Sequence, residues 1–160
     1  MKLTRGAYMT YIDATPDASS RSWYLIGKDI EDMSTELNPD IEVKKNILDE
    51  TSVDHKGYEP STEADPYYAN TTDSIYPFLR DIVMGRLKGD ACKTTVLEVI
   101  VEDTSDSSHL AYTEDVYVIP SGIGGDTAGV NIPFSINYAG NRTKGTVTLA
   151  NKVPTFTPDT

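Results

Sequence analysis

The chain has 160 residues, a length that suits one domain with one hydrophobic core, and 38 % of its residues are hydrophobic. No apolar run approaches the roughly 18 residues that a membrane-spanning helix needs, and no apolar stretch follows the positive charges near the N-terminus as in a secretory signal. The net charge of −11, without clusters of Lys and Arg, argues against phosphate-directed nucleic-acid binding, and the single Cys92 excludes an internal disulfide framework.

The first 21 residues show weak periodicity and are expected to form an N-terminal loop or arm (1–21). Trp23-Tyr24-Leu25-Ile26 then predicts a short buried strand that ends at Gly27. Between residues 29 and 65 the chain carries twelve acidic residues against three lysines, a net charge of −9. This stretch is expected to be either a solvated face or a surface that repels something anionic.

Alternating apolar and polar residues predict a first hairpin. The alternation runs through 33–37 and resumes through 41–47 after Asn38-Pro39-Asp40, where Asn-Pro is a strong turn signal. A three-residue loop over 38–40 keeps the apolar residues of both strands on one face, whereas a two-residue loop does not.

That register pairs Leu37 with Ile41 and places Glu36 opposite Glu42. Like charges directly opposed across a strand pair are mildly destabilising. The tip of this hairpin is therefore expected to be well solvated, or its negative face to serve a function.

Residues 49–72 are polar and rich in Pro, Asp, Thr and Ser, which predicts a long loop. Loops of this length are uncommon inside compact domains and are usually functional. The segment contains His55, Tyr58, Tyr67 and Tyr68. These aromatic residues make it a candidate for contact with another subunit.

Asp73 to Leu87 is the only segment with a convincing helical pattern. Asp73 is a plausible N-cap, and Gly89 is a natural stop. An apolar stripe at helical spacing is expected to cover one face of a sheet, and it consists of Ile75, Leu79, Ile82, Val83 and Leu87.

The rest of the chain predicts strands. Residues 94–102 are β-branched and apolar on both faces, which indicates a central, covered strand. A polar turn over 103–108 and a second strand over 114–119 follow, and Pro120 ends that strand. A flexible glycine-rich loop is expected over 121–126.

A last hairpin is predicted from 130–138 and 144–149, with a two-residue turn at Gly140-Asn141. One face would be apolar, with Phe134 opposite Val147. The other face would be short and polar, with pairs Ser135–Thr146 and Asn137–Lys144. Residues 151–160 are expected to form a flexible C-terminal tail.

Together these elements predict a single α+β domain over 1–160 that is mainly β, an antiparallel β-sandwich or open barrel with one α-helix.

No pattern predicts an enzyme, a cofactor or a metal site. His55 and His109 lack a partner at metal-ligand spacing, and Cys92 has no nucleophile signature around it. The glycine-rich stretch 122–129 lacks the Gly-Lys-Ser/Thr ending of a phosphate loop. A pair of carboxylates placed by the fold, as in a glycosidase, stays open without any motif that points to it.

Several strings together resemble the major tail proteins of siphophages that infect Gram-positive bacteria. These strings are Trp23–Ser34, Lys44–Val53, Gly57–Ser61, Ala64–Ala69 and Val130–Phe134, and the resemblance spans roughly residues 1–155. It implies a β-sandwich-like tail-tube domain with one helix, in which sheets from six subunits close around a channel. The rings stack into a tube through which DNA enters the host, and 49–72 would join successive rings.

The resemblance also implies partners and a place. The partners would be further copies of the chain, a tape measure protein and a tail terminator, with DNA passing through without specific binding and with no membrane. The location would be the virion tail, assembled in the bacterial cytoplasm. A tube that conducts DNA should repel phosphate or offer it no clamp. The candidate channel-facing residues are therefore Glu36, Glu42, Asn131, Ser135, Asn137, Thr146 and Thr148.

Two other functions stay open. The chain could be the inner tube protein of a contractile tail or tailocin, which shares this fold and is wrapped by a sheath. It could instead be a ligand-binding β-sandwich, such as a carbohydrate-binding module, with Trp23, tyrosines and acidic residues forming the sugar site.

Overall fold

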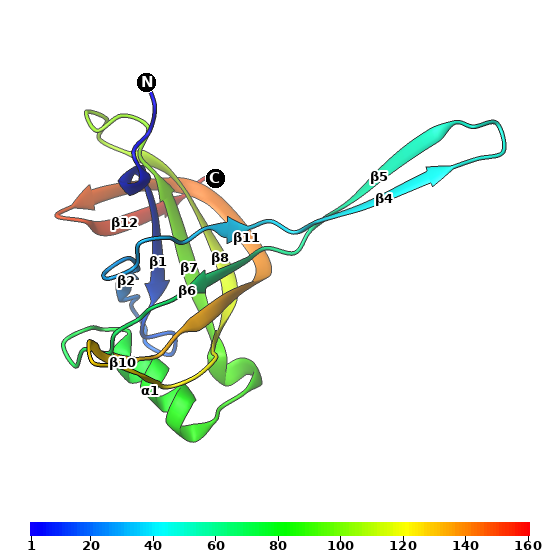
Figure 1. Cartoon of the computed structure of the whole chain (residues 1–160). Coiled ribbons are helices and arrows are strands. Elements are labelled where there is room, and N and C mark those ends of the chain that lie inside the picture. Colours follow the sequence, from blue (N-terminus) through cyan, green and yellow to red (C-terminus); the bar gives the residue numbers. More distant parts are fainter.

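One large antiparallel sheet organises the chain, as Figure 1 shows. The computed structural model describes all 160 residues. The strands of the sheet lie in the order β2–β1–β7–β8–β11–β6–β3, and β12 pairs with β11 beside this path. Their bounds are β1 (Tyr8–Asp13), β2 (Trp23–Leu25), β3 (Thr35–Glu36), β6 (Ser61–Ala64), β7 (Lys93–Ile100), β8 (His109–Pro120), β11 (Phe134–Ala150) and β12 (Val153–Pro158).

Two ribbons and one α-helix complete the fold. The ribbon strands pair only with each other. The bounds are β4 (Pro39–Lys45) with β5 (Thr51–Tyr58), β9 (Gly124–Asp126) with β10 (Gly129–Asn131), and α1 (Tyr76–Gly85). Short 3-10 turns cover Arg5–Ala7 and Gly89–Cys92. The predicted α+β, mainly β class with an antiparallel sheet and one α-helix is confirmed.

The sheet is rolled, and its inner face holds the larger core. Residues directly opposite each other on paired strands share a face, so Ile12, Val96 and Val118 all point inward. They are fully buried together with Ile136. Helix α1 lies across one end of the roll and adds Leu79 to this cluster.

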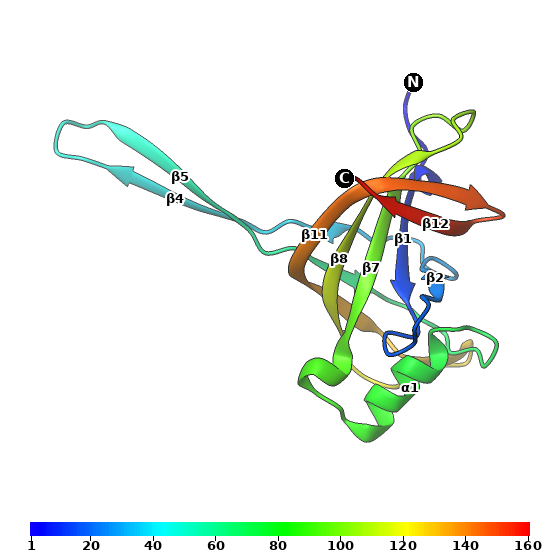
Figure 2. The ribbon, with the colours of Figure 1, turned by 180° about the vertical axis from the view of Figure 1, so that it is seen from behind.

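A second, smaller core lies on the outer face of the same sheet. The second half of β11 and β12 cross over β1, β7 and β8, which Figure 2 shows from behind. Val147 is buried there against Tyr11 and Leu97, with Phe156 of β12 packed beside them. The Tyr11 hydroxyl donates a 2.7 Å hydrogen bond to the Lys152 carbonyl in the β11–β12 turn, which ties the two layers together.

The predicted central strand and helix are confirmed. Strand β7 lies between β1 and β8 and contributes side chains to both cores. Val96 faces the larger core, and Leu97 and Val99 face the smaller one. Helix α1 buries Leu79 and Ile82, as the stripe predicted. The helix is shorter than predicted, since it begins after Ile75 and ends at Arg86, which has a left-handed backbone conformation. Asp73 does not cap the helix, and Leu87 lies beyond it and is exposed.

The predicted last hairpin is wrong. Residues 134–150 form one continuous strand, β11, that pairs with β8 from Phe134 to Val147. Gly140 (φ 102°) and Asn141 (φ 57°) do have the positive φ expected of a tight turn. They use it in a bulge, where the register against β8 shifts, so the strand bends instead of reversing. Phe134 therefore lies opposite Pro120 and Ala64, far along the strand from Val147.

The predicted first hairpin is also wrong. Strand β3 pairs with β6, so that Glu36 lies opposite Ser61, and β4 pairs with β5, so that Glu42 lies opposite Asp54. The chain reverses over 46–50 rather than 38–40. Asn38 (φ 46°) does not turn the chain back, and its amide instead donates a 3.0 Å hydrogen bond to the Glu59 carbonyl.

The four segments expected to be irregular contain strands. The N-terminal segment 1–21 includes β1, an inner strand with Tyr11 and Ile12 buried. The expected long loop 49–72 contains β5 and β6, and the expected loop 121–126 contains β9. The expected flexible tail 151–160 contains β12, which tolerates Pro154 and Pro158 because strand alternation points the backbone nitrogens of both residues away from β11.

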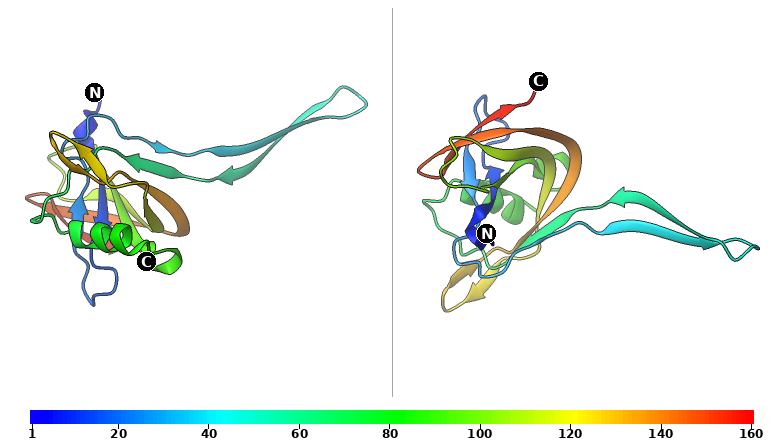
Figure 3. Two further views of the ribbon diagram at one scale, coloured as in Figure 1. Left: turned by 60° about the horizontal axis from the view of Figure 1, so that its bottom comes forward. Right: turned by 90° about the horizontal axis from the view of Figure 1, so that it is seen from above.

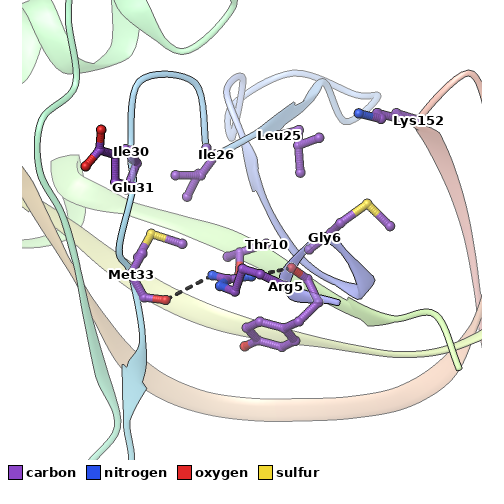
Figure 4. Close-up of a pocket in the computed structure, with 12 residues that line it drawn as sticks. Arg5, Gly6, Thr10, Leu25, Ile26, Ile30, Glu31, Met33 and Lys152 are labelled. Carbon is purple, nitrogen blue, oxygen red and sulfur yellow. Dashed lines mark hydrogen bonds between the residues drawn. The ribbon is translucent and has the colours of Figure 1, made fainter. Parts of the chain in front are cut away.

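Arg5 links β1 to the segment before β3, where the two ends of the rolled sheet approach each other; this line of approach is here called the seam. Figure 4 shows its guanidinium across a hollow of about 250 Å³, where it donates hydrogen bonds to the carbonyls of Tyr8 (2.8 Å) and Met33 (2.9 Å). The Tyr8 and Thr35 hydroxyls lie 3.3 Å apart across the same seam. Since β1 and β3 are not paired with each other by a backbone ladder, these side-chain contacts join the two ends of the roll.

Arg5→Ala should lower the free energy of unfolding by about 1–2 kcal/mol, because two carbonyls lose a charged donor. Urea denaturation measures this change. Arg80→Ala is the matched control, since the exposed Arg80 contacts only Asp81 and the Tyr76 ring of its own helix and should shift stability by less than about 0.5 kcal/mol. Equal effects of the two substitutions would contradict the role of Arg5 in closing the seam.

Candidate assembly surfaces

The ribbon β4–β5 projects from the body as an arm, here called the arm (residues 39–58). Figures 1 and 3 show it extending into solvent from several directions, without folding back on the sheet. Its turn is locally ordered, because the Asn46 side-chain oxygen accepts hydrogen bonds from the backbone N–H groups of Leu48 (2.9 Å) and Glu50 (3.0 Å). An isolated two-stranded ribbon is only marginally stable in water.

One face of the arm is apolar and uncovered. The register places Ile41 opposite His55 and Val43 opposite Val53, so these four side chains share a face. Ile41, Val43 and Val53 are each more than half exposed. His55 meets the Tyr58 ring edge to face, with centroids 4.7 Å apart, which extends this face toward the body.

The opposite face of the arm is charged. Glu42 bonds to Lys56 (2.9 Å) and to Lys44 (3.3 Å), and these two lysines offset the nearby Glu42–Asp54 pair. All of these groups are substantially exposed, so the ion pairs themselves add little stability. The arm is therefore amphipathic, with one face suited to water and one suited to a partner.

A second surface is the uncovered polar side of the body. Glu36 lies opposite Ser61, which lies opposite Asn137, and Glu63 lies opposite Ser135, so all five share the outer face of β3, β6 and β11. Glu36 and Glu63 are exposed there, and Ser61, Ser135 and Asn137 are half-buried. The hollow of about 480 Å³ beside it is also lined by Asp32 and Asp65, which makes this region acidic.

The seven candidate channel-facing residues do not form one surface. Glu36, Ser135 and Asn137 come together on the polar face just described. Glu42 lies on the arm. Thr146 and Thr148 are exposed on the second half of β11, beyond the bulge, on the opposite side of that strand from Val147.

Asn131 has a structural role inside the chain. Its side-chain oxygen accepts a 2.9 Å hydrogen bond from the Tyr67 N–H, and its amide donates a 3.2 Å hydrogen bond to Asp65. These bonds fasten the segment before α1 to β10. Asn131 was a candidate because it alternates with apolar residues, a pattern that does not distinguish a surface position from an anchor.

The four candidate inter-subunit residues do not lie on one surface either. His55 and Tyr58 lie on the apolar face of the arm, available to a partner. Tyr67 is 4 % exposed and lies in the larger core, where its hydroxyl donates a hydrogen bond to Asp73. Burial, and to a smaller extent this hydrogen bond, raises the pKa of Tyr67. Tyr68 is half-buried against Gly129, with its hydroxyl 3.4 Å from Asp126.

Sequence reasoning missed two members of the polar face, Ser61 and Glu63, because it took their strand to be part of a loop. The signal available was the alternation Ser61-Thr62-Glu63-Ala64, in which Thr62 and Ala64 are buried. No group of three or more His, Cys, Asp or Glu side chains is arranged to hold a metal ion. None of the helices has the length and apolar character needed to cross a membrane.

Comparisons with known proteins show a shared fold without sequence kinship. No protein family matches the sequence, and no curated protein is similar to it. The tube-terminating cap of the anti-feeding prophage is 8 % identical, with a TM-score of 0.53 over 91 % of this chain and 92 % of the cap. The sheath/tube terminator of a PVC extracellular contractile injection system is 6 % identical, with a TM-score of 0.48 over 90 % and 96 % of the two chains.

Asn131→Ala should lower the free energy of unfolding by about 1–3 kcal/mol, because the Tyr67 N–H loses its acceptor next to a buried ring. Thermal or urea unfolding measures the change, and Thr148→Ala on exposed β11 is the control that should stay within about 0.5 kcal/mol. If Asn131→Ala proved as mild as Thr148→Ala, the anchoring role would be wrong.

Proposed function

We propose that this chain is a structural subunit of a phage-tail-like tube and assembles with further copies of itself into rings. Each ring would stack on another or close the end of the tube. The number of six subunits and the passage of DNA are part of this proposal and come from the resemblance to tail-tube proteins. The chain would act by assembly and would catalyse no reaction.

The arm is the observation that carries this proposal. It exposes Ile41, Val43 and Val53 in one row, whereas soluble monomers keep contiguous apolar surface small. Burial of an aliphatic side chain stabilises by about 1.5–3 kcal/mol, so this row gains strongly from a partner. Since the arm extends away from its own body, the partner must be another molecule.

The fold supports a tube role. The likeness to a tube-terminating cap extends over nine-tenths of both chains, so it involves the whole domain rather than a common sub-motif. The cap is described as terminating a tube, so the likeness favours a ring at the end of a tube as one form of the proposed assembly.

The acidic polar face supports a role next to passing DNA. Glu36 and Glu63 repel phosphate within about a Debye length, on the order of 8 Å at physiological salt, and Ser135 and Asn137 on the adjacent strand β11 are uncharged. A lumen lined in this way would let DNA slide without binding it. We assign this face to the channel within the proposed ring.

Negative-stain electron microscopy and light scattering at high protein concentration test the proposal. The wild-type chain should form rings or tubes. Val43→Asp with Val53→Asp should leave it monomeric, because two charges would then lie in the apolar row of the arm. Both positions are exposed in the single chain, so folding should be unaffected.

The control lowers the net charge of the arm by the same two units on its other face. Lys56→Gln with Ser52→Asp changes two residues of β5 on that charged face, outside the apolar row and outside the tip, and this variant should assemble like the wild type. Assembly of both variants would show that the arm is not the contact. A wild-type chain that never self-associates would count against the tube proposal itself.

A further inference from the structure

The tip of the arm carries two adjacent apolar side chains that are exposed to solvent. Ile47 is 100 % exposed and Leu48 is 72 % exposed, although the turn around them is ordered by Asn46. A turn needs no apolar residues at its apex, and Gly, Asn and Asp are the usual choices. Two aliphatic residues at this place are suited to insert into a pocket of a partner, because a few buried side chains usually contribute most of the binding energy of a protein interface.

The body of the chain has one hollow with matching chemistry. It measures about 730 Å³ and lies between the N-terminal segment, the β7–β8 turn and the β11–β12 turn. Its apolar lining comes from Met1, Leu3, Met9, Val101 and Leu149. Leu3 is 45 % exposed, so part of this lining is open to solvent. The volume falls in the range of about 300–1,000 Å³ that is common for binding pockets.

Charges divide in the same way on the tip and around the hollow. On the tip, Lys44 and Lys45 precede the apex, and Asp49 and Glu50 follow it. Lys45 and Asp49 lie 3.6 Å apart in the single chain, but both side chains are largely exposed, so this weak ion pair can exchange for partners on a second copy. The hollow receives Lys2 from the N-terminal segment and Lys152 from the β11–β12 turn. Its acidic groups come from a different segment, the β7–β8 turn, which supplies Glu102, Asp103 and Asp106.

We infer that the tip of the arm of one copy inserts into this hollow of a second copy, with Ile47 and Leu48 as anchors. Asp49 and Glu50 then face Lys2 and Lys152, while Lys44 and Lys45 face the acidic β7–β8 turn. The arm cannot fill the hollow of its own chain, because it leaves the body and extends away from it. This inference rests on the proposed self-assembly and names the surfaces that carry it.

The contact is head to tail, since the tip and the hollow are different surfaces. Such contacts build a closed ring where the rotation between copies closes, and an open filament where it does not. Either geometry suits a subunit of a tube. The polar face with Glu36 and Asn137 takes no part in this contact and stays free to line a channel.

Crosslinking between differently labelled copies tests the inference. Leu48→Cys is mixed with Leu3→Cys, and a short bis-maleimide reagent joins thiols that come close. The native Cys92 does not interfere, because it is 3 % exposed and burial raises the pKa of its thiol. We expect a mixed dimer in high yield. Met84→Cys on α1, 70 % exposed and remote from the hollow, replaces Leu3→Cys in the control and should give at least tenfold less.

Two sets of substitutions complete the test by sedimentation. Ile47→Ser with Leu48→Ser should weaken self-association by tenfold or more. Asp49→Lys with Glu50→Lys should also weaken it, and adding Lys2→Glu with Lys152→Glu in the same chain should restore it. The inference is overturned if the wild type self-associates and the tip substitutions change nothing, or if both crosslinking pairs react equally. A wild type without any self-association would instead overturn the proposed function together with it.

Discussion

The bend in β11 is the constraint on which the rest of the structure depends. One strand serves both cores because the bulge at Gly140 and Asn141 sends its second half over the outer face of the sheet. Arg142 holds the bend in place. Its guanidinium donates to Glu114 of β8 (2.9 Å) and to Glu98 of β7 (3.0 Å), and it stacks on Tyr112, 4.4 Å from the ring centroid. Hydrogen-bonded, half-buried pairs of this kind are stronger than exposed ones.

Because the bend lets the chain cover its own sheet on both sides, the body needs no partner to hide its main apolar surface. The arm gathers a group of exposed aliphatic residues on one element, and these are Ile41, Val43, Ile47, Leu48 and Val53. Stability and assembly are thereby separated. The two cores hold the fold, while the exposed apolar residues of the arm are the ones that the proposed assembly would bury. Such a division suits a subunit that must stay folded before it assembles.

Sequence reasoning succeeded where a signal is local and has one meaning. The period of the α1 stripe and the β-branched run of β7 each predicted their element and its burial. It failed at Asn38 and Gly140, because a residue that accepts positive φ suits a turn, a bulge and the root of an arm equally well. The polar face was predicted in part through Ser135 and Asn137. Which strand pairs with β11 is decided by contacts between segments far apart in the sequence. Ser61 and Glu63 of β6 could therefore not be placed beside Ser135 and Asn137 from the sequence.

Hydrogen exchange of the backbone amides in dilute and in concentrated protein tests the central claim, that the arm is unsupported until a second copy binds it. The amides of β7 and β8 provide an internal reference, since they lie in the centre of the sheet in either condition. The account predicts that β4 and β5 exchange rapidly in dilute protein and become protected as association proceeds. Protection of the arm that is the same at both concentrations, while the protein visibly self-associates, would contradict it.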